Sequence, residues 1–149
     1  MGVIVPKKKR ANKPIIKGFE LKFLAKARGN HAVGDLFIYH EGNLLKYFNA
    51  NSGKWGRGFL PNGKYIAKYW RQEAGEPFSI SGYGFFVYIE PQFKTDRTEL
   101  GIHMDGNVPG SRGCIALNAY SEIDARDTYN YIKQIFREQN EVPLVVNIT

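Results

Sequence analysis

The sequence predicts a mostly β fold with one substantial helix. Most of the chain divides into short runs of β-branched and aromatic residues, separated by turns rich in Gly, Pro and Asn. Only residues 121–136 have helical spacing of apolar side chains. With 149 residues, 43% of them hydrophobic, the chain can bury the core of one domain, which we expect over residues 18–149.

The first half of the chain has the pattern of half-buried strands. Apolar and polar residues alternate through 19–24, where we expect the folded domain to begin. Two further β-rich runs, 35–40 and 44–48, are separated by Glu41-Gly42-Asn43. Because Gly and Asn tolerate the positive φ of a tight turn, these runs predict a hairpin.

The middle of the chain alternates loops with strands. Residues 51–58 contain three glycines and little periodicity, which predicts a loop. A strand is expected over 64–70, then a Gly-rich loop over 79–84, a buried central strand over 85–89, and a short strand over 100–104.

The C-terminal segment predicts the helix. Ser121 is a suitable N-cap, with Asp124 at the third helical position. Pro143 is expected to stop the helix, and 144–148 to form a final strand. Side chains that share the buried face of this helix are Ile123, Thr128, Ile132, Ile135 and Phe136.

Positive charge is concentrated at the N-terminus. The net charge is +7, and residues 1–17 hold six Lys and Arg with no acid, so residues 18–149 carry only +1. We therefore expect a flexible basic arm over 1–17, solvated or weakly tethered to anionic polymer or headgroups. The nearly neutral domain argues against a nucleic-acid partner.

No export signal or membrane span is predicted. The basic run 7–10 is followed by Ala11-Asn12-Lys13-Pro14 instead of the apolar stretch of about 7 to 15 residues that a Sec signal needs. No apolar run reaches the roughly 18 residues of a transmembrane helix. Action in the periplasm or cell wall would therefore require delivery by a route other than Sec.

The single cysteine, Cys114, is the candidate nucleophile. It can form no intramolecular disulfide, and it follows Gly110-Ser111-Arg112-Gly113, a composition that bends and exposes the backbone. A base or positive charge would lower the thiol pKa from about 8.5 toward roughly 3.5 to 7.5. His103, eleven residues earlier, and Arg112 can supply both, whereas His31 and His40 lack this context.

These residues carry a family resemblance. Gly101-Ile102-His103, followed by Ser111-Arg112-Gly113-Cys114-Ile115, resembles the catalytic signature of the L,D-transpeptidase family. Ser52-Gly53 and Pro61-Asn62-Gly63-Lys64-Tyr65 resemble two upstream elements, and the resemblance covers about residues 36–148. The short spacer between His103 and Ser111 is closest to that of the L,D-transpeptidase-like effectors that bacteria inject into rivals. Many members have His and Arg where this chain has Arg112 and Ala116.

The resemblance implies a β-sandwich or barrel and acyl transfer on peptidoglycan stem tetrapeptides. Cys114 would attack the carbonyl of the L-centre of diaminopimelate, with His103 as base, and expel D-Ala to leave a thioester. The N–H groups of Gly113 and Cys114 would stabilise the oxyanion. Ser111 would hydrogen-bond within the loop, and Asp105 would orient His103. No cofactor is implied.

Substrate contacts and outcome follow from the same resemblance. Arg112 is expected to take over part of the recognition of the donor carboxylate. Tyr83, in the loop before the central strand, is expected either to line the peptide groove or to pack at the strand edge. The short spacer leaves few residues for a lid, so hydrolysis or D-amino-acid exchange is favoured over 3-3 cross-linking. The setting stays open between a phage lysis enzyme, a wall-remodelling enzyme and an injected toxin, which would have an immunity protein as a further partner.

The sequence leaves two other classes of function open. A zinc peptidase could use His103, Asp105 and Cys114, but neither His-Glu-x-x-His nor Cys-x-x-Cys occurs. A non-catalytic module could bind a polyanion or glycan through the basic arm and the aromatic residues. Against this, most aromatic residues lie in strand-like runs, where a core explains them.

Overall fold

The structure is a computed structural model that describes residues 17–75, 77–106 and 110–149. The predicted basic arm, apart from Lys17, lies outside the described residues. Its strands are β1 (Phe19–Arg28), β2 (His31–His40), β3 (Asn43–Gly53), β4 (Gly63–Gln72), β5 (Ser79–Ile80), β6 (Tyr83–Pro91), β7 (Gly101–Met104), β8 (Ile115–Leu117) and β9 (Glu141–Ile148), with helix α2 (Glu122–Glu138).

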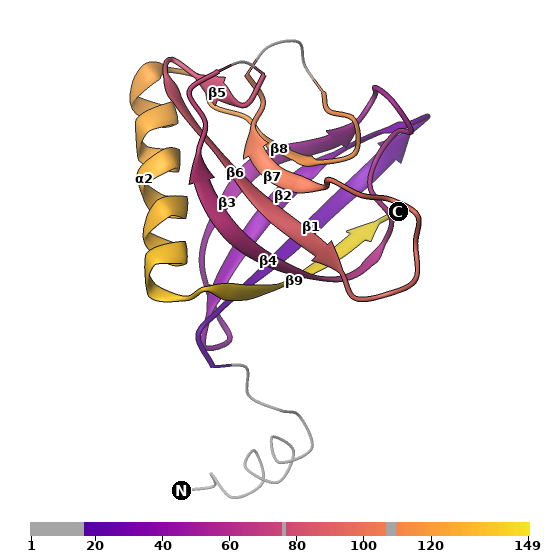
Figure 1. The fold of residues 1–149 in the computed structure, drawn as a ribbon, viewed down its shortest axis with the longest axis horizontal. Coiled ribbons are helices and arrows are strands. Elements are labelled where there is room, and N and C mark those ends of the chain that lie inside the picture. Colours follow the sequence, from indigo (N-terminus) through magenta and orange to yellow (C-terminus); the bar gives the residue numbers. More distant parts are fainter. Residues whose placement is uncertain (1–16, 76, 107–109) are drawn as a thin grey trace, which may run out of the picture.

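Eight of the strands close into a barrel (Figure 1). Their order is β4-β9-β1-β2-β3-β8-β7-β6, and β6 pairs back onto β4, while the short β5 pairs only with β6. The β1–β9 and β7–β8 pairs are parallel, and the other pairs are antiparallel. The mostly β fold with one substantial helix, in barrel form, is therefore as predicted.

Alternating side chains build the barrel core. In β1 the buried residues are Leu21, Phe23 and Ala25, every second position, as the pleat of a strand requires. The β2–β3 hairpin is confirmed, with a tight turn in which Glu41 and Gly42 have positive φ angles of 50° and 84°. Two consecutive positive φ angles match the twist of the flanking strands.

Helix α2 covers one side of the barrel, against β4 and β6 (Figure 1). Ser121 is its N-cap, and the Ser121 hydroxyl accepts a hydrogen bond of 3.0 Å from the N–H of Asp124, as predicted. The helix buries Ala125, Thr128, Ile132, Ile135 and Phe136, whereas Ile123, expected on this face, is exposed. No helix in the described part of the chain is both long and apolar enough to cross a membrane.

Several elements differ from the predictions. The Gly-rich loop predicted over 79–84 contains β5 and the first two residues of β6. The segment predicted as a loop from residue 51 continues β3 through Gly53, because Asn51 and Ser52 are buried and paired with β2. Pro143 lies inside β9, opposite Ile66, and the helix has already ended at Glu138. Strand β8 was not predicted, since three residues are too few to show a period.

The pairing of β7 with β8 positions the candidate site. These parallel strands place Ile102 opposite Ile115 and His103 opposite Ala116. Cys114 immediately precedes β8, so it lies beside the beginning of β7, the strand that carries His103. The β7–β8 pairing therefore places the two candidate residues on neighbouring segments of the sheet.

Candidate active site

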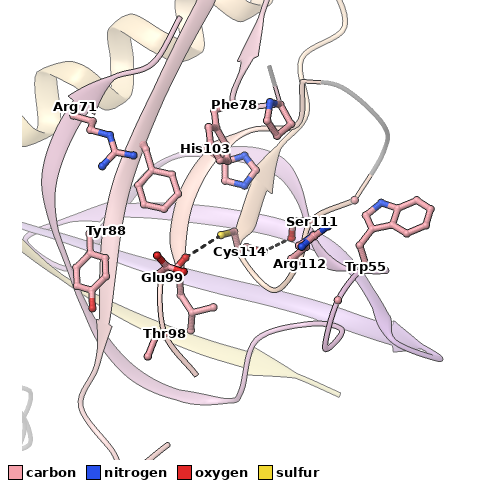
Figure 2. Close-up of a pocket in the computed structure, with 15 residues that line it drawn as sticks. Trp55, Arg71, Phe78, Tyr88, Thr98, Glu99, His103, Ser111, Arg112 and Cys114 are labelled. Carbon is pink, nitrogen blue, oxygen red and sulfur yellow. Dashed lines mark hydrogen bonds between the residues drawn. The ribbon is translucent and has the colours of Figure 1, made fainter. Parts of the chain in front are cut away.

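His103 and Cys114 open into one cavity of about 1150 Å³ (Figure 2). Ser111 and Arg112 line the same cavity. In the view of Figure 2, Trp55 and Arg112 lie on one side of Cys114, and the cavity extends on the other side toward Arg71, Tyr88 and Glu99. The structure thus brings the motif residues together in a space that can accept a peptide.

The imidazole of His103 is fixed by aromatic rings and one hydrogen bond. Its ring stacks on Phe86 at 6.1 Å and meets Phe78 edge-on at 4.8 Å. Nδ1 lies 2.7 Å from the carbonyl oxygen of Met104. Because a carbonyl oxygen can only accept, Nδ1 carries the hydrogen and donates this hydrogen bond. Burial lowers the pKa of His103, so the neutral ring leaves Nε2 as the basic nitrogen.

The thiol of Cys114 is protonated at neutral pH. Desolvation raises its pKa to about 11, although the backbone N–H of Gly101 and the charge of Arg97 act to lower it. Within the described residues, the sulfur is hydrogen-bonded to the carbonyl oxygen of Glu99, at 3.8 Å, and not to His103. The expected lowered pKa is therefore wrong for this resting state, because desolvation outweighs both stabilising groups.

Ser111 organises the turn that carries Cys114. Its hydroxyl donates to the Cys114 carbonyl at 2.9 Å and accepts from the N–H groups of Gly53 and Gly113 at 3.2 and 3.3 Å. Ser111 thus bonds within the loop, as expected, and ties the turn to the end of β3. The Gly113 N–H, expected as an oxyanion donor, is engaged by Ser111 in this conformation, which leaves the Cys114 N–H as the candidate.

Asp105 holds the connection between β7 and β8 instead of orienting His103. Its Oδ2 accepts hydrogen bonds from the side chain of Asn51 at 2.8 Å and the N–H of Gly110 at 3.2 Å. The expectation that Asp105 orients His103 is therefore wrong, since the Met104 carbonyl oxygen accepts the hydrogen bond of Nδ1–H. Asp105 influences His103 only through space, where its negative charge favours the imidazolium.

The two predicted substrate-binding residues have different fates. Arg112 is exposed and lines the cavity, with its stem against Gly56. Tyr83 does not line the cavity and instead packs against Tyr129 of α2, at 5.8 Å between ring centroids. Alternation along β6 explains this, because Phe86 and Tyr88, on the opposite face of the strand from Tyr83, line the cavity.

Several residues of the site had no motif to identify them. Phe86 and Tyr88 could have been found from the alternation in β6. Arg71 lies on β4, the other strand of the β4–β6 pair. Glu99 and Arg97 belong to the connection between β6 and β7, where the sequence has no period, and only the folded chain places them beside Cys114.

The remaining histidines have ordinary partners, as expected. His31 Nε2 lies 3.2 Å from the side-chain oxygen of Asn51, and the ring of His40 packs on Phe19 at 4.6 Å. Among residues 17–75, 77–106 and 110–149, no group of three or more His, Cys, Asp and Glu side chains is arranged to hold a metal ion.

Comparison with known proteins gives a likeness in fold. No family model matches the sequence, and no curated protein matches it. Among solved structures, the fold is similar to that of an L,D-transpeptidase from Mycobacterium smegmatis, with 18% sequence identity and a TM-score of 0.46. The match covers 87% of this chain and 59% of that one, so this chain spans less than two thirds of the length of that structure.

Proposed function

We propose that this chain is a peptidoglycan-active cysteine enzyme of the L,D-transpeptidase type. One observation carries the proposal: His103 on β7 and Cys114, which immediately precedes the adjoining parallel strand β8, open into one cavity. A rigid sheet holding a base and a thiol at one cavity is the arrangement that nucleophilic acyl transfer needs.

The resting protonation states fit a general-base mechanism. His103 Nε2 takes the thiol proton while the sulfur of Cys114 attacks the carbonyl carbon of the L-centre of diaminopimelate. When the C–N bond breaks, the amine of D-Ala leaves with that proton, and a thioester remains on Cys114. Water or a free D-amino acid then attacks the thioester carbonyl and gives its proton to His103. When the C–S bond breaks, the Cys114 sulfur takes that proton back from His103.

The cavity also suits a charged stem peptide. Arg112 and Arg71 are on different sides of Cys114 in Figure 2, and guanidinium groups bind carboxylates in a planar, two-bonded geometry. Glu99 adds a carboxylate that can pair with a substrate ammonium group. Stem peptides offer both kinds of charge, because they end in a carboxylate and the diaminopimelate residue carries an ammonium group.

Mass spectrometry of muropeptides after incubation with the purified protein tests this proposal. We expect tripeptides from tetrapeptide stems, and D-amino-acid exchange when free D-amino acids are supplied. Cys114→Ala, Cys114→Ser and His103→Ala should abolish both products while the circular dichroism spectrum stays that of the wild type. Wild-type activity in Cys114→Ala would overturn the proposal.

Two other outcomes separate the alternatives. If 3-3 cross-linked dimers are the main product, the chain is a wall-remodelling transpeptidase, and the preference for hydrolysis is wrong. Loss of activity in EDTA would favour the zinc peptidase instead. Action in the periplasm or cell wall, with an immunity protein if the enzyme is a toxin, stays a prediction from the sequence.

A further inference from the structure

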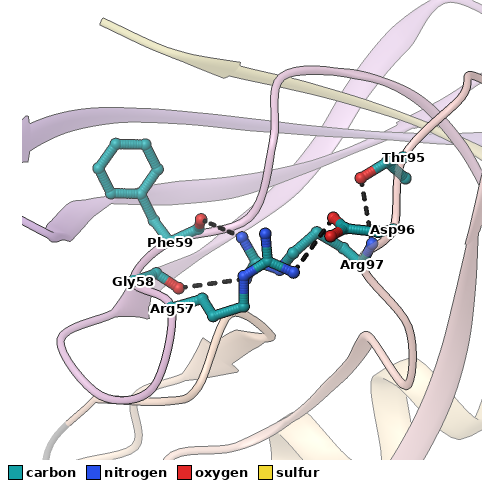
Figure 3. Close-up of polar contacts among 6 residues, drawn as sticks. All are labelled: Arg57, Gly58, Phe59, Thr95, Asp96 and Arg97. Atoms are coloured by element: carbon teal, nitrogen blue, oxygen red, sulfur yellow. Dashed lines mark hydrogen bonds and ion pairs between the residues drawn. The ribbon is translucent and has the colours of Figure 1, made fainter.

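Arg97 joins two loops that are distant in the sequence. It lies in the connection between β6 and β7 and is half-buried. Its Nη1 donates to the carbonyl oxygen of Phe59 at 3.2 Å, and its Nη2 donates to that of Gly58 at 3.3 Å (Figure 3). Both carbonyls belong to the segment between β3 and β4, so the guanidinium fixes that segment against its own loop.

The same guanidinium lies against the turn that carries Cys114. A Cβ atom built on Gly113 would overlap Nη2 of Arg97 and would lie 3.2 Å from the carbonyl oxygen of Gly58. Gly113 also has a φ of 117°, a conformation that favours glycine. Because Gly113 has no side chain, the guanidinium of Arg97 can contact the backbone directly before Cys114.

The charge of Arg97 is not neutralised by a neighbouring carboxylate. Within the described ranges, its hydrogen-bond partners through the guanidinium are two neutral carbonyls, and no ion pair includes it. Arg57, close by in Figure 3, differs, because it is exposed and pairs with Asp96 at 3.1 Å. A partly buried, permanently charged guanidinium without a carboxylate partner favours negative charge on a nearby sulfur.

We propose that Arg97 is a positioning residue of the active site, which holds the Gly113–Cys114 turn in place and stabilises negative charge on the Cys114 sulfur. In agreement, its charge lowers the pKa of Cys114 against the larger effect of desolvation. The importance of this role for turnover rests on the proposed function. The effect on the thiol itself requires no substrate.

Alkylation of Cys114 by iodoacetamide measures this effect directly, in folded protein without substrate, at pH 6 to 9. Arg97→Met removes the charge and raises the thiol pKa, so it should slow alkylation by about threefold for each unit of pKa. The factor is below ten because a more basic thiolate is also more nucleophilic. Arg97→Lys keeps a charge and should restore much of the rate. Arg57→Met, the matched control, should alkylate like the wild type.

A purely structural role for Arg97 predicts the opposite sign. A loosened turn would expose the thiol to water, bring its pKa toward the ordinary value of about 8.5, and speed alkylation. Faster or unchanged alkylation in Arg97→Met would therefore overturn the proposal. If Arg97→Met does not fold, Arg97→Gln gives the answer, because it removes the charge and keeps an amide donor for one of the two carbonyls.

The two proposals fail separately. If the alkylation rates follow the expected order but muropeptides are not processed, the proposed function is wrong, and the role of Arg97 toward the thiol stands. If muropeptides are processed but alkylation is the same in Arg97→Met, Arg97→Lys and the wild type, the role of Arg97 is wrong, and the proposed function stands.

Discussion

The thiol of Cys114 is hydrogen-bonded to the carbonyl oxygen of Glu99, at 3.8 Å. Glu99 has a φ of 56°, a left-handed conformation that costs a residue with a side chain about 1 to 2 kcal/mol. The carbonyl so placed accepts from the protonated thiol and offers nothing to a thiolate. The contact and the desolvation of the sulfur therefore both favour a neutral resting nucleophile.

The first prediction follows from that neutral state. Because the pKa of Cys114 is about 11 and the pKa of His103 is lowered, thiol and imidazole are both neutral around pH 7. Alkylation of Cys114 by iodoacetamide should rise steadily with pH from 6 toward 11, whereas the urea-unfolded protein should level off above about pH 8.5. A rate that does not vary between pH 5 and 8 would instead reveal a thiolate–imidazolium pair.

A second prediction concerns stability in acid. The folded-state pKa of His103 lies below its unfolded value, so the unfolded chain binds the proton first as the pH falls below about 6.5. The stability contributed by neutral His103 is thus fully present above pH 6.5. It is lost as the pH falls from 6.5 toward the lowered pKa of the folded state. The melting temperature should fall more between pH 7.5 and pH 5 in the wild type than in His103→Gln. Equal decreases would show that His103 does not titrate in this way.

A third prediction concerns the carboxylate of Asp105. Besides Asn51 and Gly110, it accepts from the side chain of Asn118 at 3.4 Å, so Asp105→Ala leaves three donors without this acceptor. We expect a loss of about 1 to 3 kcal/mol in the free energy of unfolding, and slower turnover because the loop loosens. Asp35→Ala is the control, since that carboxylate accepts from an exposed Asn49. Denaturant titration that finds equal losses for both would contradict the prediction.

A fourth prediction compares two glycines with positive φ. Gly29→Ala, with φ of 61° and nothing within 4 Å of the new Cβ, should cost about 1 kcal/mol of unfolding free energy from backbone strain alone. Gly113→Ala adds an overlap with Arg97 and should cost clearly more. Combining it with Arg97→Ala should recover part of the loss in a double-mutant cycle. Additive losses would show that the two residues do not meet.

The fifth prediction concerns the basic arm. Deleting residues 1–17 removes six positive charges and should weaken binding to whole sacculi at low salt. The rate on small soluble muropeptides should not change. Replacing the six Lys and Arg by Gln, at full length, should reproduce the deletion in a sedimentation assay. An inactive or unfolded truncation would show that the arm is structural.

The sequence alone determined most of the architecture. Apolar alternation in residues such as Leu21 and Phe23 predicts strands, because a pleated chain buries every second side chain. The helix could be predicted from the Ser121 cap and its apolar spacing, which are local signals. Cys114 and His103 could be predicted as candidates from the His and Ser-x-Gly-Cys segments, because a reaction needs particular residue types and these appear directly in the sequence.

Only the tertiary structure decided the environment of those candidates. Glu99 is fifteen residues from Cys114, and no local pattern indicates that its carbonyl receives the thiol. The same holds for Arg97. The folded chain places its guanidinium against Gly113, where its charge acts on the neighbouring Cys114 sulfur. The sequence predicted an activated thiolate and the structure has a protonated thiol, because desolvation depends on all the atoms packed around a group, and folding alone brings those atoms together.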